Sequence, residues 1–105
     1  QDHAAEWAER YGLTLFTCWG SPLDREGLGI QVDHAAMNET SLMLALHPDL
    51  VEMDRLPKDL YEWPVGVGGK DPRLYANAEL GERALREQVA RMAALLREAL
   101  AQIRS

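Results

Sequence analysis

The 105-residue sequence has one cysteine, few aromatic residues and no long apolar run. The single cysteine, Cys18, excludes an internal disulfide and suits a reducing compartment, so we expect a cytoplasmic location. Because no apolar run approaches membrane-spanning length, we expect no membrane association. The formal charge of −6, with acids and bases interspersed, argues against a nucleic-acid-binding surface.

Two familiar site motifs are also absent. The stretch Gly66-Val67-Gly68-Gly69 is rich in glycine, but it lacks the flanking strand and helix and the Lys-Ser/Thr ending of a phosphate-binding loop. The central segment contains one histidine five positions before a glutamate, not the two histidines of a zinc-protease helix. These absences exclude a nucleotide-binding loop and a zinc-protease helix.

An initiator methionine is missing, and no cap residue precedes the first helical pattern. The length allows at most one small domain. We therefore expect the chain to be a piece of a longer protein, and the sequence leaves open whether it is a cleavage product, an ordered part or a fragment.

The hydrophobic pattern predicts helices alternating with buried strands. Helices are expected over residues 2–11, ended by Gly12, over residues 40–46, and over residues 77–104, begun by Asn77 as the N-cap. A buried strand is expected over residues 13–19, and a short strand or an extended link over residues 50–53. Residues 56–74, rich in proline and glycine, are expected to form an ordered surface loop with Tyr61 and Trp63 as a candidate oligomer contact. The last helix carries one apolar stripe, formed by Leu85, Val89, Met92, Leu96, Ala99 and Ile103. This order fits half of a three-layer α/β/α domain.

The segment from Asp33 to Leu46 brings an imidazole, His34, and a carboxylate, Glu39, to the start of a helix. Glu39 shares a helical face with Ala35, Leu42 and Leu46, so we expect it to point inward and to need a cation, a metal or a strong donor. The positive end of the helix dipole favours an anion, either Asp33 or a bound ligand. The alternative is that His34 is a solvated residue beside the cap and Glu39 merely favours the first helical turn.

These residues resemble the creatininase (creatinine amidohydrolase) family. The similarity comprises the histidine, two small residues, Glu39-Thr40-Ser41, the Leu/Met-rich helix and Pro48-Asp49-Leu50-Val51. It continues through Asp54-Arg55-Leu56, with weaker agreement at Asp71-Pro72 and Gly81-Glu82.

The resemblance implies an α/β fold of three layers, α/β/α, in which residues 1–105 are about the C-terminal half of a single domain. It also implies a metal-dependent amidohydrolase that acts on a small cyclic or linear amide C–N bond. The metal would be zinc and/or manganese, and its ligands would lie mainly in the N-terminal half, with none in this chain. The implied partners are that N-terminal half and further copies of the protein, as a homo-oligomer such as the family's hexamer.

By position in the family motif, His34 is implied as the proton-transfer or substrate-orienting group and Glu39 as the group that holds or polarises it. Amide hydrolysis needs such an acid to protonate the leaving nitrogen. Asp33 is a further substrate-binding candidate. So is Trp19, which ends a predicted strand, where α/β proteins place their sites, although it is equally suited to closing a core.

The substrate-binding candidates Ile30 and Gln31 depart from the family pattern. Creatininase itself has tryptophan and aspartate at these positions, where they contact the substrate. An apolar side chain and a neutral amide cannot supply the same stacking and charge, so we do not expect creatinine as the substrate. Deformylation of pyrimidine intermediates and trimming of modified peptides stay open. The competing hypothesis is a non-catalytic interaction subunit, in which His34 and Glu39 brace a helix and the long last helix associates with a partner.

Overall fold

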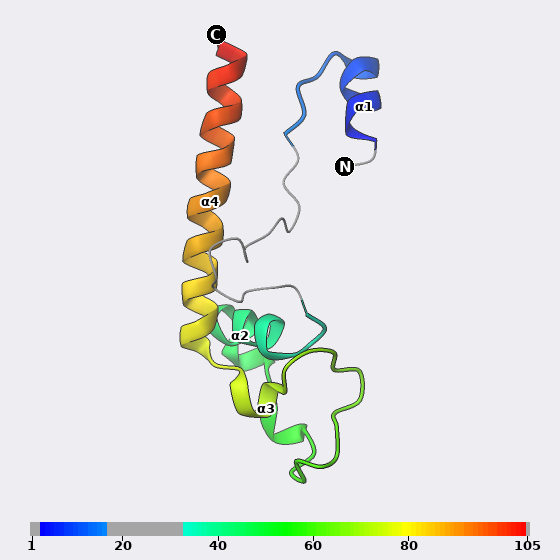
Figure 1. Ribbon diagram of the computed structural model, residues 1–105, viewed down its shortest axis with the longest axis vertical. Helices are drawn as coiled ribbons and strands as arrows, with labels where there is room; N and C mark the ends of the chain where they lie inside the picture. Colours follow the sequence, from blue (N-terminus) through cyan, green and yellow to red (C-terminus); the bar gives the residue numbers. More distant parts are fainter. Residues whose placement is uncertain (1–2, 17–32, 105) are drawn as a thin grey trace. The chain divides into compact units, whose positions relative to one another are not determined.

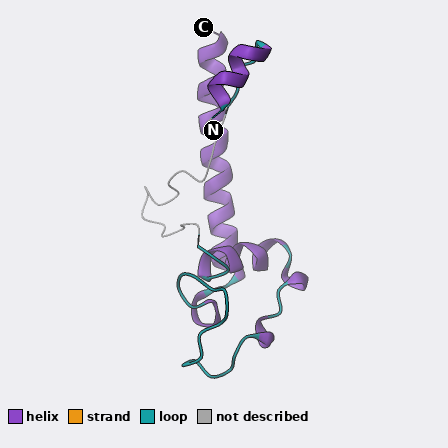
Figure 2. Cartoon of the chain, turned by 90° about the vertical axis from the view of Figure 1, so that its right-hand side faces the viewer, coloured by secondary structure: helices purple, strands orange, loops and turns teal. Residues whose placement is uncertain are grey.

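The computed structural model describes residues 3–16 and 33–104. Within these ranges the chain forms helices, loops and one isolated β-bridge, but no strand (Figure 2). The chain divides into two units, residues 22–88 and residues 1–21 with 89–105. None of the described helices is both long and apolar enough to cross a membrane.

The first helix, α1 (Ala4–Tyr11), confirms the sequence prediction. It ends because Gly12 adopts the left-handed conformation, at φ 62°, and donates its N–H to the carbonyls of Ala8 and Glu9. Glycine is the usual residue at this position because it lacks the Cβ that makes such a conformation costly.

The strand predicted after α1 is not seen in the part that the structure describes. Leu13, Leu15 and Phe16 pair with no neighbouring strand, and their side chains are 39–54% exposed. A buried strand needs neighbouring strands on both sides, and the described residues contain no other strand to pair with it. The rest of the predicted strand, including Cys18 and Trp19, lies outside the described residues.

Of the two alternatives predicted for residues 50–53, the structure has the extended link and not the strand. Two 3₁₀ turns, η2 (Pro48–Leu50) and η3 (Met53–Arg55), flank an extended Val51. Proline fixes the backbone dihedral needed to begin the first turn, and Leu50 is 67% exposed rather than paired in a sheet.

The unit formed by residues 22–88 is organised by α2 (Met37–Leu46), α3 (Pro72–Tyr75) and the first turns of α4 (Ala78–Arg104). As predicted, Asn77 caps α4, because its Oδ1 accepts the N–H of Leu80 at 2.8 Å. Figure 1 shows α2 lying against the beginning of α4. The backbones meet at Gly81, where an added Cβ would lie 1.9 Å from the carbonyl oxygen of Ser41.

Small residues therefore make up most of the buried positions of this unit. They come from α2, α3, α4 and the residue before α2: Ala36, Ser41, Pro72, Gly81 and Ala84. The Ser41 hydroxyl donates to the carbonyl of Met37 and accepts the N–H of Asn77 at 3.1 Å, which ties α2 to the start of α4.

The predicted inward face of α2 is wrong. Ala35 and Leu46 are exposed and Glu39 is half-buried, whereas Asn38 and Ser41 are buried. Apolar residues lie all round α2, so their spacing does not determine which face is buried. Gly81 of α4 determines it, because the missing side chain lets the face of α2 that carries Ser41 pack closely.

The predicted apolar stripe of α4 is largely uncovered within the described residues. Val89, Met92, Leu96 and Ile103 are 42–64% exposed, while Leu85 is half-buried. In the unit that contains residues 89–105, Leu96, Ala99, Leu100 and Ile103 line an apolar groove of about 490 Å³ together with Leu15 and Phe16.

Candidate functional site

Asp33 caps the candidate site helix with both of its carboxylate oxygens. Oδ2 accepts the N–H of Asn38 at 2.7 Å and Oδ1 accepts the N–H of Glu39 at 3.0 Å. The N–H of Met37 donates to the carbonyl of Lys70 at 3.0 Å. Of the two anions that the sequence allowed at this helix start, the structure therefore has Asp33 in place.

The Glu39 carboxylate accepts the N–H of Ala35 at 2.8 Å, in an exposed hydrogen bond. The arrangement resembles a capping box, since Glu39 reaches back to the chain before the helix while its own N–H binds Asp33. No hydrogen bond joins the Glu39 carboxylate to the His34 imidazole, although both residues lie in the described part of the chain. Glu39 thus holds the backbone beside His34 and not the imidazole itself.

His34 is exposed, but its backbone is fixed. Its N–H donates to the carbonyl of Gly68 at 2.9 Å, and the N–H of Gly68 donates back to its carbonyl at 2.8 Å. The next residue, Gly69, has φ 142° and lies so close that an added Cβ would be 2.8 Å from the Cβ of Ala36. The imidazole therefore extends from a backbone held on one side by the α2 cap and on the other by a glycine pair.

A buried ion pair lies at the start of α3. The side chains of Asp71 and Arg73 are only 9% and 8% exposed, and their charged groups approach to 2.8 Å. The hydrogen bond from Arg73 lowers the pKa of the Asp71 carboxyl below its ordinary 3.8, although burial opposes the shift. The same bond raises the pKa of Arg73.

Sequence reasoning missed Arg73 and the glycine pair. The sequence excludes a phosphate-binding loop at these glycines, but an adjacent pair also indicates a close backbone approach, which is their role here. The substrate-binding candidates Trp19, Ile30 and Gln31 lie outside the described residues.

The described residues do not fit a metal centre. They contain no group of three or more His, Cys, Asp or Glu side chains placed to hold a metal ion. Within the candidate site, Asp33 already accepts two backbone N–H groups and Glu39 accepts a third.

His34 thus has an exposed imidazole on a backbone that is fixed from both sides. The chain belongs to the creatininase family, because the family model described as creatinine amidohydrolase matches residues 3–96. The family implies an α/β fold and suggests a hydrolase that acts on C–N amide bonds.

Among curated proteins, the creatinine amidohydrolase of Pseudomonas putida is 59% identical to this chain over 29 residues. The matched stretch covers 28% of this chain but only 11% of that relative. No solved structure matches the chain significantly.

Proposed function

We propose that this chain is the His34-bearing part of a metal-dependent amidohydrolase that acts on a small cyclic or linear amide other than creatinine. The observation that carries the proposal is the exposed imidazole on a backbone paired with Gly68 in both directions. The family match over residues 3–96 supports amide hydrolysis as the reaction class.

In this proposal His34 transfers a proton to the leaving nitrogen as the amide C–N bond breaks. Histidine suits the task because its charge changes near neutral pH, and a positioned general acid contributes roughly 10²–10⁴-fold to a rate. Asp33 and Glu39 keep the segment in place through the backbone N–H groups of Asn38 and Ala35. Ile30 and Gln31 would contact the substrate and disfavour creatinine.

The complete enzyme would need metal ligands, which the described residues do not bring together. The family is generally metal-dependent, and we propose that the ligands for zinc and/or manganese come from the N-terminal half of the same protein. That half is also the proposed cover for the exposed apolar stripe of α4. A homo-oligomer, with Tyr61 and Trp63 as contacts, and a cytoplasmic location complete the proposal.

The test is His34→Ala in the complete protein, assayed on a panel of cyclic ureides, N-formyl amides, N-acyl amides and creatinine. We expect kcat on the best substrate to fall by about 10²–10⁴-fold. The unfolding midpoint should be unchanged, because the imidazole is exposed. His47→Ala is the matched control, since His47 is an exposed histidine at the other end of α2 and should retain wild-type kcat. Full activity of His34→Ala would contradict the proposal.

One observation favours the second candidate, a non-catalytic interaction subunit. Both carboxylates of the segment, Asp33 and Glu39, bind backbone N–H groups, as expected if the segment only braces a helix. On that hypothesis the metal-loaded wild-type protein hydrolyses no amide of the panel, whereas the first proposal requires turnover of at least one.

A further inference from the structure

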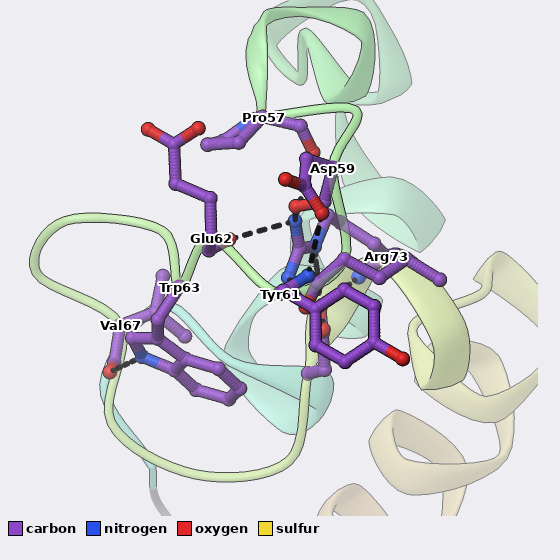
Figure 3. A network of polar contacts seen from close by, with 9 residues as sticks. Pro57, Asp59, Tyr61, Glu62, Trp63, Val67 and Arg73 are labelled. Atoms are coloured by element: carbon purple, nitrogen blue, oxygen red, sulfur yellow. Dashed lines mark hydrogen bonds and ion pairs between the residues drawn. The ribbon is translucent and has the colours of Figure 1, made fainter.

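The loop that pairs with His34 is held mainly by one buried guanidinium. Nη1 of Arg73 donates to the carbonyls of Pro57 at 2.8 Å and of Asp59 and Glu62 at 3.0 Å (Figure 3). Nη2 donates more weakly to the carbonyl of Leu60, at 3.4 Å. Four carbonyls within six residues thus converge on one side chain, and the several N–H groups of the arginine fork bind them, with one N–H shared between two carbonyls.

Asp71 fixes the orientation of that fork. Its carboxylate accepts Nη2 at 2.8 Å and Nε at 3.0 and 3.2 Å, and it also accepts the backbone N–H of Arg73 at 3.0 Å. The other N–H groups of the guanidinium, on Nη1 and Nη2, face the loop. We refer to Asp71, Arg73 and the four carbonyls as the arginine clamp.

Side-chain packing contributes little to holding this loop. Tyr61 and Val65 are fully exposed, and Leu60 and Trp63 are about half exposed. Pro64 is the one buried residue among residues 57–70. Since hydrophobic burial stabilises in proportion to the apolar area removed from water, these side chains cannot fix the path of the loop. The arginine clamp can fix the path of the loop, because Arg73 binds the backbone carbonyls directly.

From the clamp, the loop runs to the candidate site. The indole Nε1 of Trp63 donates to the carbonyl of Val67 at 2.8 Å and closes a turn, which Figure 3 shows beside the clamp. The next residue, Gly68, makes the two backbone hydrogen bonds to His34, and Lys70 accepts the N–H of Met37 at the start of α2. The hydrogen bonds made by Arg73, Trp63 and Gly68, together with the chain that joins these loop positions, therefore connect the clamp to the backbone of His34.

We propose that Arg73, oriented by Asp71, is a positioning residue for His34: the arginine clamp sets the path of residues 57–67 so that Gly68 holds the histidine backbone in place. The inference rests on the proposed function only for its catalytic consequence. The positioning itself is a physical property that is measurable without a substrate.

The experiment uses Arg73→Lys in the complete protein. Lysine keeps the charge beside Asp71 but has no fork, so it cannot reach the four carbonyls together. Arg55→Lys is the matched control, because Arg55 pairs with Glu52 through an exposed side chain and contacts no loop carbonyl.

Two readouts require no substrate. Amide hydrogen exchange at His34 and Gly68 should become at least about tenfold faster in Arg73→Lys, because the paired backbone opens locally. The rate at which diethyl pyrocarbonate modifies His34, followed by peptide mass spectrometry, should change while the rate at His47 does not. Arg55→Lys should alter neither. A lowered unfolding midpoint with both His34 readouts at wild-type values would overturn the positioning role and leave a structural one.

The third readout is the steady-state rate on the best amide of the panel. Arg73→Lys should lower kcat by about 10–100-fold with KM nearly unchanged, since a small displacement of a catalytic group costs on that order. Equal loss of kcat in Arg55→Lys, or a purely KM effect, would contradict the inference. If the wild-type protein hydrolyses no amide, the proposed function fails while the exchange and modification readouts still decide the inference.

Asp71→Asn is the second variant if Arg73→Lys does not fold. It keeps the guanidinium but removes the charge that orients it. Faster exchange at His34 and Gly68, by a smaller factor than for the lysine variant, supports the clamp, and unchanged exchange contradicts it.

Discussion

At the scale of single residues, Ala35 has the least favourable backbone conformation near the site. Its φ of 50° places it in the left-handed region, where it is the one non-glycine among the described residues. The N–H of Ala35 donates to Glu39, and its carbonyl accepts the hydroxyl of Thr40 at 3.1 Å. Two side chains of α2 thus maintain a conformation that costs about 1–3 kcal/mol, directly beside His34.

We predict that Ala35→Gly stabilises the complete protein by about 0.5–1 kcal/mol. Removing the Cβ relieves the left-handed strain, and this gain exceeds the roughly 0.5–1 kcal/mol that glycine adds to the entropy of the unfolded chain. The measurement is the denaturant dependence of unfolding. Ala36→Gly is the control and should destabilise, because Ala36 is fully buried and has extended backbone. A loss of stability in both variants would contradict the strain argument.

The sequence predicted the residue-level chemistry in part. Asp33 was one of two expected anions at the helix start, because that expectation depends only on the local dipole. The contact between Glu39 and Ala35 was not foreseen, because the face assigned to Glu39 depended on which side of α2 is buried. That side is set by Gly81, which lies forty-two positions away in the sequence.

At the scale of elements, the α2–α4 contact depends on a glycine in a helix. Gly81 lies in the first turn and a half of α4, where alanine would normally be preferred by about 1 kcal/mol. Here an alanine Cβ would meet the Ser41 carbonyl oxygen at 1.9 Å and the Cβ of Ala45 at 3.0 Å. Because the nearest atom belongs to the backbone, the helices would have to separate.

We predict that Gly81→Ala destabilises the protein by about 1–3 kcal/mol, since overpacking outweighs the gain in helix propensity. The measurement is the urea midpoint, with hydrogen exchange at Asn77 as a local reporter because its N–H binds Ser41. The control, Ala90→Gly on the exposed surface of α4, isolates the propensity difference of about 1 kcal/mol. A stabilised Gly81→Ala protein would disprove the close contact.

The clamp gives the loop element a defined pH dependence. Arg73 lowers the pKa of Asp71, so the folded state favours the charged carboxylate. The resulting stability is present above the ordinary value of 3.8 and is lost as pH falls through the lowered pKa of the folded state. The raised pKa of Arg73 adds no dependence in this range, because the guanidinium stays charged.

We therefore predict that Asp71→Asn is less stable than wild type at pH 7 and that the difference shrinks only as pH falls below about 4. Unfolding midpoints measured from pH 7 to pH 2.5 test this. Asp54→Asn, at an exposed aspartate of η3, is the control and should show a small difference throughout. A difference between wild type and Asp71→Asn that stays constant to pH 2.5 would contradict the ion-pair explanation.

Element prediction succeeded where the signal is local. Gly12 and Asn77 mark a helix end and a helix start through backbone conformation and capping, which need no partner. The predicted strands depended on burial by other segments. The apolar run at Leu13–Phe16 has the composition of a buried strand, yet it lies exposed and unpaired in the described part of the chain.

At the scale of the whole molecule, the family match and the described residues give different information about the fold. The family match over residues 3–96 implies an α/β fold, while the described ranges contain helices and loops. Sheet pairing is long-range, so a single strand pattern predicts a sheet only if other strands are available to flank it. The exposed apolar stripe of α4 has a similar explanation. The helical pattern predicts that one face is apolar, but it does not predict which segment covers that face.

The last prediction concerns how the metal and the proton-transfer group are divided between parts of the protein. The carboxylate oxygens of Asp33 and Glu39 accept backbone N–H groups, and the described residues bring together no metal-binding group. In the complete protein we therefore expect His34→Ala and Glu39→Gln to retain the full wild-type content of zinc or manganese while His34→Ala loses most of its activity. Glu39→Gln keeps an oxygen that can accept the N–H of Ala35, so it should also retain most of its stability.

Elemental analysis of the purified proteins, alongside unfolding midpoints and steady-state rates, measures metal content, stability and activity. Wild-type protein treated with a chelator is the metal-free control. Loss of one metal equivalent in either variant would place residues 33–39 in the metal centre itself and overturn the division of roles.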